Sequence, residues 1–241
     1  MDDRAALALQ VAWGADEALG SEPRDRRRRT ELSVPPSQIA AAPIVVEVPP
    51  HSESVGEIDA AWRASGGAGL AVTARHFVGV RGADDAKVLI LGDCPGEAEE
   101  RSGVAFDGPA GALLATMLAS AGIAAADLAF GYVVPWRPPG GRPPSDLEIT
   151  ASAPFLRARL AARPPRIVVP CATVAARILL GEAAGARTRG KLLRVTVDRL
   201  TLPCLSIQSP EQAMASGPAK ARLWASLRLL RRSNDGAQES H

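Results

Sequence analysis

The chain has 241 residues, of which 46% are hydrophobic and 22% charged, so it can form one large domain or two small ones. This composition is close to that of soluble globular proteins and excludes wholesale disorder. The net charge of +2, from 28 basic and 26 acidic residues, means that any basic nucleic-acid surface must be local. No apolar run reaches the roughly 18 residues of a membrane span, and the N-terminus shows no secretory signal. We therefore expect a cytoplasmic protein that does not associate with membranes.

The cysteines limit the metal chemistry that the chain can hold. Cys94, Cys171 and Cys204 stand far apart, so the sequence contains neither a zinc-ribbon pattern nor a CxxC redox motif. An all-cysteine iron–sulfur cluster usually needs four thiolates. The histidines do not pair at metal-ligand spacing either. We therefore expect no metal site.

The N-terminal part of the chain has the pattern of an extension followed by a linker. Residues 4–20 predict a helix, and residues 21–53 combine six prolines with the basic run Arg24–Arg29. Proline at this density blocks regular structure. The arginine run is either a solvated segment or a contact to a nucleic-acid backbone. We divide the chain into a helical extension (1–20), a Pro/Arg-rich linker (21–53), a folded domain (54–234) and a disordered tail (235–241).

Apolar runs alternate with helical patterns after residue 86. The expected strands are Val88–Leu91, Phe130–Val134, Ile167–Val169 and Cys204–Ile207. The expected helices cover residues 54–64, 109–121, 145–162, 173–180 and 218–231, and residues 192–202 suggest an excursion or a hairpin. This alternation predicts an α/β fold, a three-layer α/β/α sandwich around a mainly parallel four-stranded sheet. Ligands bind beyond the carboxyl ends of such strands. The informative loops therefore begin at Gly92, Pro135, Cys171 and Gln208.

The first of these loops is rich in glycine. It spans residues 92–100 and continues through Phe106 and Gly108 to a helix start at Pro109. Glycines let backbone N–H groups approach a ligand, and a helix N-terminus favours an anion. The spacing fits neither a P-loop nor a dinucleotide-binding fingerprint, so this loop alone is a weak signal.

Together with its neighbours, this loop resembles the family 4 uracil-DNA glycosylases. The motifs are Gly-Asp-x-Pro-Gly-x-x-Glu at 92–99, Phe-x-Gly-Pro-x-Gly at 106–111, Trp-Arg-Pro-Pro-Gly-x-Arg at 136–142 and Arg-Gly-Lys at 189–191. The spacing from Ser209-Pro210 to Leu223-Trp224 also fits, and the resemblance covers nearly the whole chain. It implies a uracil-DNA glycosylase-like fold and a role in base-excision DNA repair. Such enzymes flip uracil out of DNA and hydrolyse its N-glycosidic bond.

The resemblance also assigns roles around the base. Asp93 stands where the family usually has Glu, near the attacking water, and Phe106 stacks on the flipped base. Cys94, Pro95, Gly96 and Glu99 shape the base pocket. The alternatives are that Phe106 is plain core and that Asp93 caps a turn.

Five further residues face the DNA backbone by the same resemblance. They are Trp136, Arg137, Arg142, Arg189 and Lys191. The alternative for the arginines is that they are solvated surface residues, since arginine greatly outnumbers lysine along the whole chain.

Two pocket positions depart from the family pattern. Tyr132 stands where the family has an asparagine that reads the uracil edge, and a phenol cannot reproduce that bidentate pairing. Ser209 stands where the family has a histidine that donates to the uracil oxygen, so it is at best a weak substitute donor. Losing one such donor typically costs on the order of 10²–10³ in rate. The family's Tyr-Leu-Leu stretch is also replaced, by Gln212-Ala213-Met214.

The cluster ligands of the family are missing as well. Its members bind a [4Fe–4S] cluster, partly through a cysteine pair before the first strand and one cysteine on the third helix. Residues 66–82 contain no cysteine here, and Ser152 falls at the helix position. We therefore expect no cofactor.

Three functions remain open. The first is a uracil-DNA glycosylase-like protein that acts on a flipped base in DNA, with uracil excision weak or lost. The second is a catalytically silent DNA-binding or interaction module on the same fold. The third is a glycosylase with a different base specificity, set by Tyr132. We expect DNA as the partner, including uracil-containing DNA, and a monomer.

Overall fold

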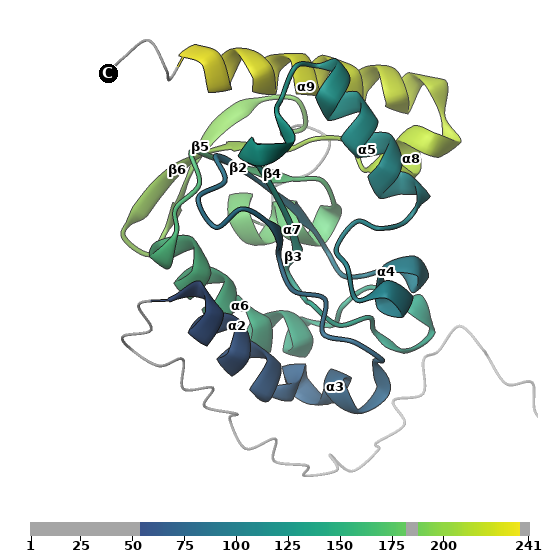
Figure 1. Ribbon diagram of the computed structural model, residues 1–241, viewed down its shortest axis with the longest axis vertical. Helices are drawn as coiled ribbons and strands as arrows, with labels where there is room; N and C mark the ends of the chain where they lie inside the picture. The colour runs from purple at the N-terminus through teal and green to yellow at the C-terminus, as the bar shows by residue number, and fades with distance from the viewer. Residues whose placement is uncertain (1–53, 182–187, 237–241) are drawn as a thin grey trace, which may run out of the picture. The chain divides into compact units, whose positions relative to one another are not determined.

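The computed structural model describes residues 54–181 and 188–236 of the chain (Figure 1). A mixed sheet with the strand order β1-β3-β2-β4-β6-β5 forms its centre. The strands are β1 (Arg81–Gly82), β2 (Val88–Gly92), β3 (Leu128–Tyr132), β4 (Ile167–Pro170), β5 (Leu192–Val197) and β6 (Leu200–Leu205). The four central strands run parallel, and the edge strands β1 and β5 pair antiparallel to β3 and β6. The expected extension and linker lie outside the described residues.

The central strands are the four that the sequence predicts, and the α/β sandwich is confirmed. Every residue of β2, β3 and β4 is buried, which explains their continuous apolar runs. Within residues 54–181 and 188–236 the sheet has six strands rather than four. The short strand β1 adds to one edge, and residues 192–202 form most of the β5–β6 hairpin at the other.

Helices cover both faces of the sheet. One face packs against α5 (Pro109–Ser120), α8 (Pro210–Ala215) and α9 (Gly217–Gly236), and the other against α2 (Val55–Ala64), α3 (Leu70–Thr73), α6 (Asp146–Ala162) and α7 (Thr173–Leu180). Val88 and Ile90 point into the first layer, while Leu89 and Leu91 point into the second. Because successive side chains of a strand point to opposite faces of the sheet, the interior is divided into two apolar clusters.

The connections complete the fold. The glycine-rich first loop contains α4 (Glu97–Ser102), and single 3-10 turns occur at η1 (Gly66–Gly69), η2 (Ala125–Asp127) and η3 (Pro139–Gly141). At the start of α6, the Ser145 hydroxyl accepts from Glu148 N–H at 3.4 Å, and the Glu148 carboxylate accepts from Ser145 N–H at 2.7 Å. This is the predicted capping box. No helix among the described residues is long and apolar enough to cross a membrane.

Candidate functional site

A cavity of about 400 Å³ opens at the carboxyl ends of β2, β3, β4 and β6, and we call it the base cavity. All four loops that the sequence singles out contribute to it. Its lining residues are Gly92, Asp93, Cys94, Pro95, Gly96, Glu97, Glu99, Phe106, Tyr132, Arg137, Gly141, Cys171, Ala172, Thr173, Arg189, Ser209, Glu211 and Gln212. The parallel strands bring these loops together because their carboxyl ends share one edge of the sheet.

Two aromatic rings stack inside the base cavity. The rings of Phe106 and Tyr132 are parallel within 1°, with centroids 5.1 Å apart. The backbone N–H of Phe106 also donates to the Tyr132 hydroxyl at 3.2 Å. Both rings lie over Gly92, where a Cβ would stand 2.8 Å from the Tyr132 ring. Burial raises the pKa of Tyr132 far above its ordinary value, so the phenol stays neutral.

The backbone of Phe106 is strained. Its φ of +54° lies in the left-handed region, which bulky residues rarely adopt. A side chain at Gly111 would clash with the Phe106 carbonyl, so the turn fits against α5 only because residue 111 is glycine. Strain of this kind costs roughly 1–3 kcal/mol and collects at functional sites. The packing against α5 therefore holds the Phe106 backbone in this conformation.

Glu99 and Arg137 tie the loops of the cavity to one another. The Glu99 carboxylate accepts from the backbone N–H groups of Gly96 and Gly108, both at 3.1 Å. Arg137 forms an ion pair with Glu100 of α4 at 3.1 Å. Glu99 thus joins the first loop to the turn that carries Phe106, and Arg137 joins the loop after β3 to α4.

Asp93 lines the base cavity and also caps a helix. Its Oδ1 accepts from Ala175 N–H in the first turn of α7 at 2.7 Å, and the residue at the N-cap position of that helix, Ala172, has no side-chain acceptor. Burial raises the pKa of Asp93 above its ordinary value, a nearby Glu211 carboxylate adds to the rise, and the Ala175 N–H opposes it. The expected carboxylate is therefore at the cavity wall, and one of its oxygens is held by α7.

Ser209 uses its hydroxyl within its own turn. It accepts from Gln212 N–H at 3.2 Å as the N-cap of α8 and donates its proton to Glu211 at 2.9 Å. Glu211 is a cavity residue that our sequence analysis did not single out, although it directly follows the Ser209-Pro210 motif. The loops are those that the sequence predicts, but the sequence did not mark the following residues as lining the cavity: Glu97, Gly141, Cys171, Ala172, Thr173 and Gln212.

The cysteines of the site are held in the thiol form. Burial raises the pKa of Cys94 to about 12, and it raises the pKa of Cys171 well above the ordinary value. Within the described part of the chain, no group of three or more His, Cys, Asp or Glu residues could hold a metal ion. The donor set therefore does not fit a [4Fe–4S] cluster.

Aromatic packing surrounds the helix position where the resemblance places a cluster ligand. Ser152 is fully buried, and its hydroxyl has no hydrogen-bond partner among the residues that the structure describes. One turn later on α6, Phe155 stacks on Trp62 with centroids 5.8 Å apart. Phe77 extends this cluster and meets Trp136 edge to face at 5.1 Å.

Trp136 is only 2% exposed, so the structure places it in the core and not at a DNA-facing surface, contrary to our expectation.

The other expected DNA contacts occupy different places. Arg137 and Arg189 line the base cavity. Arg142 forms a two-point ion pair with Glu148, with N···O distances of 2.6 and 2.9 Å, and this pair lowers the pKa of Glu148 to about 2. Lys191 is exposed just before β5 and does not line the cavity.

Comparison with known proteins identifies the family. Residues 80–228 match the model of the uracil DNA glycosylase superfamily. The chain belongs to this superfamily. It is 31% identical over 121 residues to the type-4 uracil-DNA glycosylase of Pyrobaculum aerophilum, covering 46% of this chain and 62% of the relative. It is also 31% identical over 128 residues to the type-4 uracil-DNA glycosylase of Archaeoglobus fulgidus, covering 51% and 64%. The match to the Thermotoga maritima enzyme of the same name is 36% over 85 residues, covering 35% and 44%.

These matches confirm the resemblance to the family 4 enzymes. They span less than two thirds of the length of each of these relatives. The superfamily match begins just before β1 and ends within α9, so it includes every residue that lines the base cavity.

Proposed function

We propose that this superfamily member binds DNA, takes a flipped base into the base cavity, and excises uracil weakly or not at all. The observation that carries this proposal is the stacking of Tyr132 on Phe106 inside that cavity. The printed names of the relatives, which are type-4 uracil-DNA glycosylases, support DNA repair as the setting. We further propose that the protein is monomeric and cytoplasmic and that it carries no cofactor.

The stacked pair is the physical reason for which we expect weak uracil excision. A flipped base needs an aromatic face to stack on and donors at its polar edge. Tyr132 already takes one face of the Phe106 ring and the Phe106 N–H. As long as the Tyr132 ring stays in this position, uracil can use neither that face of the Phe106 ring nor the Phe106 N–H. The asparagine that the family has at position 132 would leave this space open because its side chain is smaller than that of tyrosine.

The chemistry of the remaining residues supports the same conclusion. In hydrolysis, Asp93 orients the water that attacks the sugar carbon, and the electron pair of the glycosidic bond leaves with the base. Negative charge then builds on uracil and needs hydrogen-bond donors. The Ser209 proton is directed to Glu211 instead, so the hydroxyl does not supply one. The site thus keeps a carboxylate for water, while Tyr132 and Ser209 do not supply the two donors that the resemblance implies for the leaving group.

Glu211 favours a second candidate function, a glycosylase for a different base. Its carboxylate adds to the upward pKa shifts of Asp93, Tyr132 and Cys171, so its negative charge is felt throughout the cavity. An anionic leaving uracil is repelled by this charge. A base that already carries an additional proton or alkyl group leaves in a neutral form, and this charge does not repel it.

Uracil release under single-turnover conditions tests the proposal. Excess protein is mixed with a uracil-containing oligonucleotide, and DNA binding is measured in parallel as a function of salt. We expect salt-sensitive binding with slow or no release, and we expect Asp93→Asn and Phe106→Ala to abolish any release. Rapid release by the wild type contradicts weak excision, and absence of binding contradicts the whole proposal. Binding without release of any base points to the silent module.

A further inference from the structure

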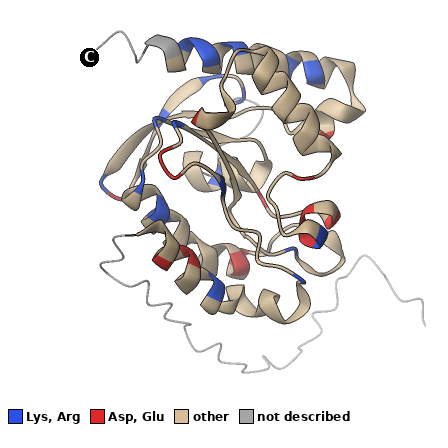
Figure 2. Cartoon of the chain, viewed as in Figure 1, with Lys and Arg blue, Asp and Glu red and all other residues tan. Residues whose placement is uncertain are grey.

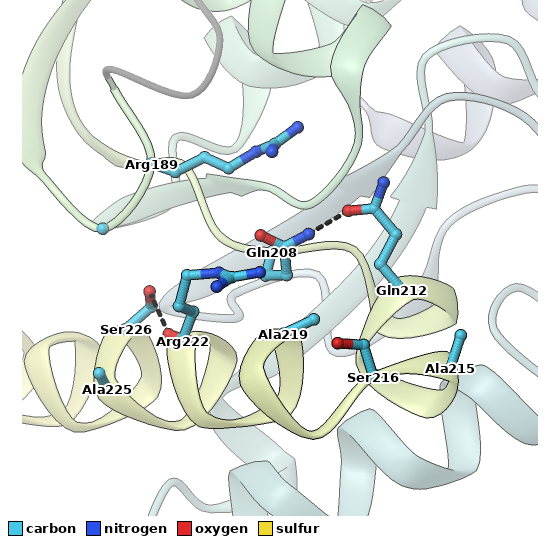
Figure 3. A pocket seen from close by; sticks show the side chains of 10 residues that line it. Arg189, Gln208, Gln212, Ala215, Ser216, Ala219, Arg222, Ala225 and Ser226 are labelled. Carbon is cyan, nitrogen blue, oxygen red and sulfur yellow. Dashed lines mark hydrogen bonds between the residues drawn. The ribbon is translucent and has the colours of Figure 1, made fainter.

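A second hollow, of about 750 Å³, adjoins the base cavity, and we call it the arginine groove (Figure 3). It lies between the turn at residues 188–191 on one side and α8 and α9 on the other. Its volume is within the roughly 300–1,000 Å³ typical of ligand sites. Small residues such as Ala215, Ser216 and Ala219 form its floor, so the space above the helices is open.

Two arginines form opposite walls of this groove. Figure 3 shows Arg189 reaching across from the turn and Arg222 rising from α9, with both guanidinium groups extending in the same direction. The turn is anchored because Gly190 N–H donates to the Ser206 carbonyl at 2.8 Å. It also lies against α9, since a Cβ on Gly190 would stand 3.5 Å from the Ser226 hydroxyl. The spacing between the two walls is therefore fixed by the fold.

The charges of the groove and of the base cavity are opposite in character. The only charged residues that line the groove are Arg189 and Arg222, and within the described residues neither pairs with a carboxylate. The base cavity has an acidic balance instead, because its four acidic residues, Asp93, Glu97, Glu99 and Glu211, outnumber its two arginines, Arg137 and Arg189. Figure 2 shows basic residues along α9, the helix that carries Arg222, and acidic residues at α4, the helix that carries Glu97 and Glu99. An anion is therefore favoured in the groove and disfavoured in the cavity.

The two hollows are neighbours that share part of their walls. Arg189 and Gln212 line both of them. The Gln212 side-chain oxygen accepts from the side-chain amide of Gln208, which is buried in the loop after β6. This pairing fixes the Gln212 side chain at the boundary and leaves its NH₂ group as a donor there. A chain molecule can thus place one part in the cavity and the next part in the groove.

We propose that the arginine groove binds the phosphodiester next to the nucleotide whose base enters the base cavity. Arg189 and Arg222 grip this phosphate from both sides, because the planar guanidinium matches phosphate oxygens in a two-point geometry. The acidic cavity receives the uncharged base, and the basic groove receives the charged backbone. This inference rests on the proposed function, since it requires DNA as the ligand.

A methylphosphonate scan tests the site. Single-stranded oligonucleotides carry one non-cleavable 2′-fluoro-2′-deoxyuridine, and each phosphate near it is replaced in turn by an uncharged methylphosphonate. Affinity is measured by fluorescence anisotropy over a range of salt concentrations. The variants are Arg222→Ala, Arg189→Ala and the matched control Arg228→Ala. Arg228 is exposed on the same helix, six residues further on and so about 240° around its axis, outside the groove.

The inference predicts that one methylphosphonate beside the fluorinated nucleotide weakens wild-type binding about tenfold. Arg222→Ala and Arg189→Ala should weaken binding to unmodified DNA by a similar factor and should no longer respond to that substitution. Each should also lower the salt slope by about 0.7. Arg228→Ala should change affinity less than twofold.

Two results overturn the inference while leaving the proposed function intact. One is an equal loss of affinity in Arg222→Ala and Arg228→Ala, which indicates only a general effect of positive charge. The other is an Arg222→Ala variant that responds to every methylphosphonate as the wild type does. If the wild type binds no oligonucleotide, the proposed function itself fails, and the phosphate site fails with it.

Discussion

Replacing Tyr132 with asparagine should open the base cavity and restore uracil excision. The change removes the ring that stacks on Phe106 at 5.1 Å and frees the Phe106 N–H. It also supplies an amide that can both donate to and accept from the edge of a base. One restored polar partner of this kind is worth on the order of 10²–10³ in rate. We expect the single-turnover rate of uracil release to rise by about that factor.

The same change should destabilise the fold. Replacing a buried aromatic side chain by a small one typically costs about 3–5 kcal/mol. Domains of ordinary stability have about 5–15 kcal/mol in total. The variant should therefore remain mostly folded at 25 °C, with a clearly lower midpoint in urea.

Tyr132→Phe is the matched control because it keeps the ring and removes only the hydroxyl. The Phe106 N–H then loses its acceptor, which should cost about 1–3 kcal/mol without opening the cavity. Both variants are assayed for uracil release at excess protein, and their folding is checked by circular dichroism. The reasoning is refuted if folded Tyr132→Asn releases uracil no faster than Tyr132→Phe.

Three further predictions concern stability. Burial raises the pKa of Asp93, so the free energy of unfolding of the wild type should fall as pH rises from about 3.8 through the folded pKa. Over the same pH range, Asp93→Asn should become more stable relative to the wild type, because it carries no charge and can still accept from Ala175 N–H. Glu148→Gln should be less stable than the wild type at neutral pH, a difference that should vanish as pH falls from 4.5 to about 2. Phe155→Ala should cost about 3–5 kcal/mol because its ring stacks on Trp62. Urea titrations over pH check all three.

A spectroscopic prediction follows from the missing ligands. Protein purified without oxygen should show no visible iron–sulfur absorption band, because the described thiols are not grouped. A band that disappears on cluster removal would contradict this expectation.

The central fold could be predicted because burial leaves a direct mark on sequence. Strands β2, β3 and β4 are buried on both faces and therefore read as unbroken apolar runs. Strand β1 has only two residues, too few to show a pattern, and it exists because Arg81 pairs with Phe130. Strand β6 begins at Leu200, earlier than expected, because its first residues pair with β5.

The loops of the candidate site could be predicted, but the uses of their side chains could not. The position of each loop follows from the rule that parallel strands end at a common edge. The parallel stacking of Tyr132 on Phe106, the burial of Trp136 and the bond from Ser209 to Glu211 each depend on tertiary distances. No local pattern encodes those distances. The motif therefore locates the site, while the structure determines which of its groups are free to act.

The proposal that the Tyr132 ring weakens uracil excision is tested most directly by measuring where that ring lies when DNA is bound. Tyr132 is the only tyrosine in the chain, so protein labelled with 3-fluorotyrosine gives a single ¹⁹F resonance. We predict a resonance that is displaced by the Phe106 ring current, returns toward the unfolded position in Phe106→Ala, and does not return toward that position when saturating uracil-containing DNA is bound. A resonance that moves to the unfolded position when this DNA binds would show that Tyr132 swings out of the cavity, and it would contradict the proposal that this ring weakens excision.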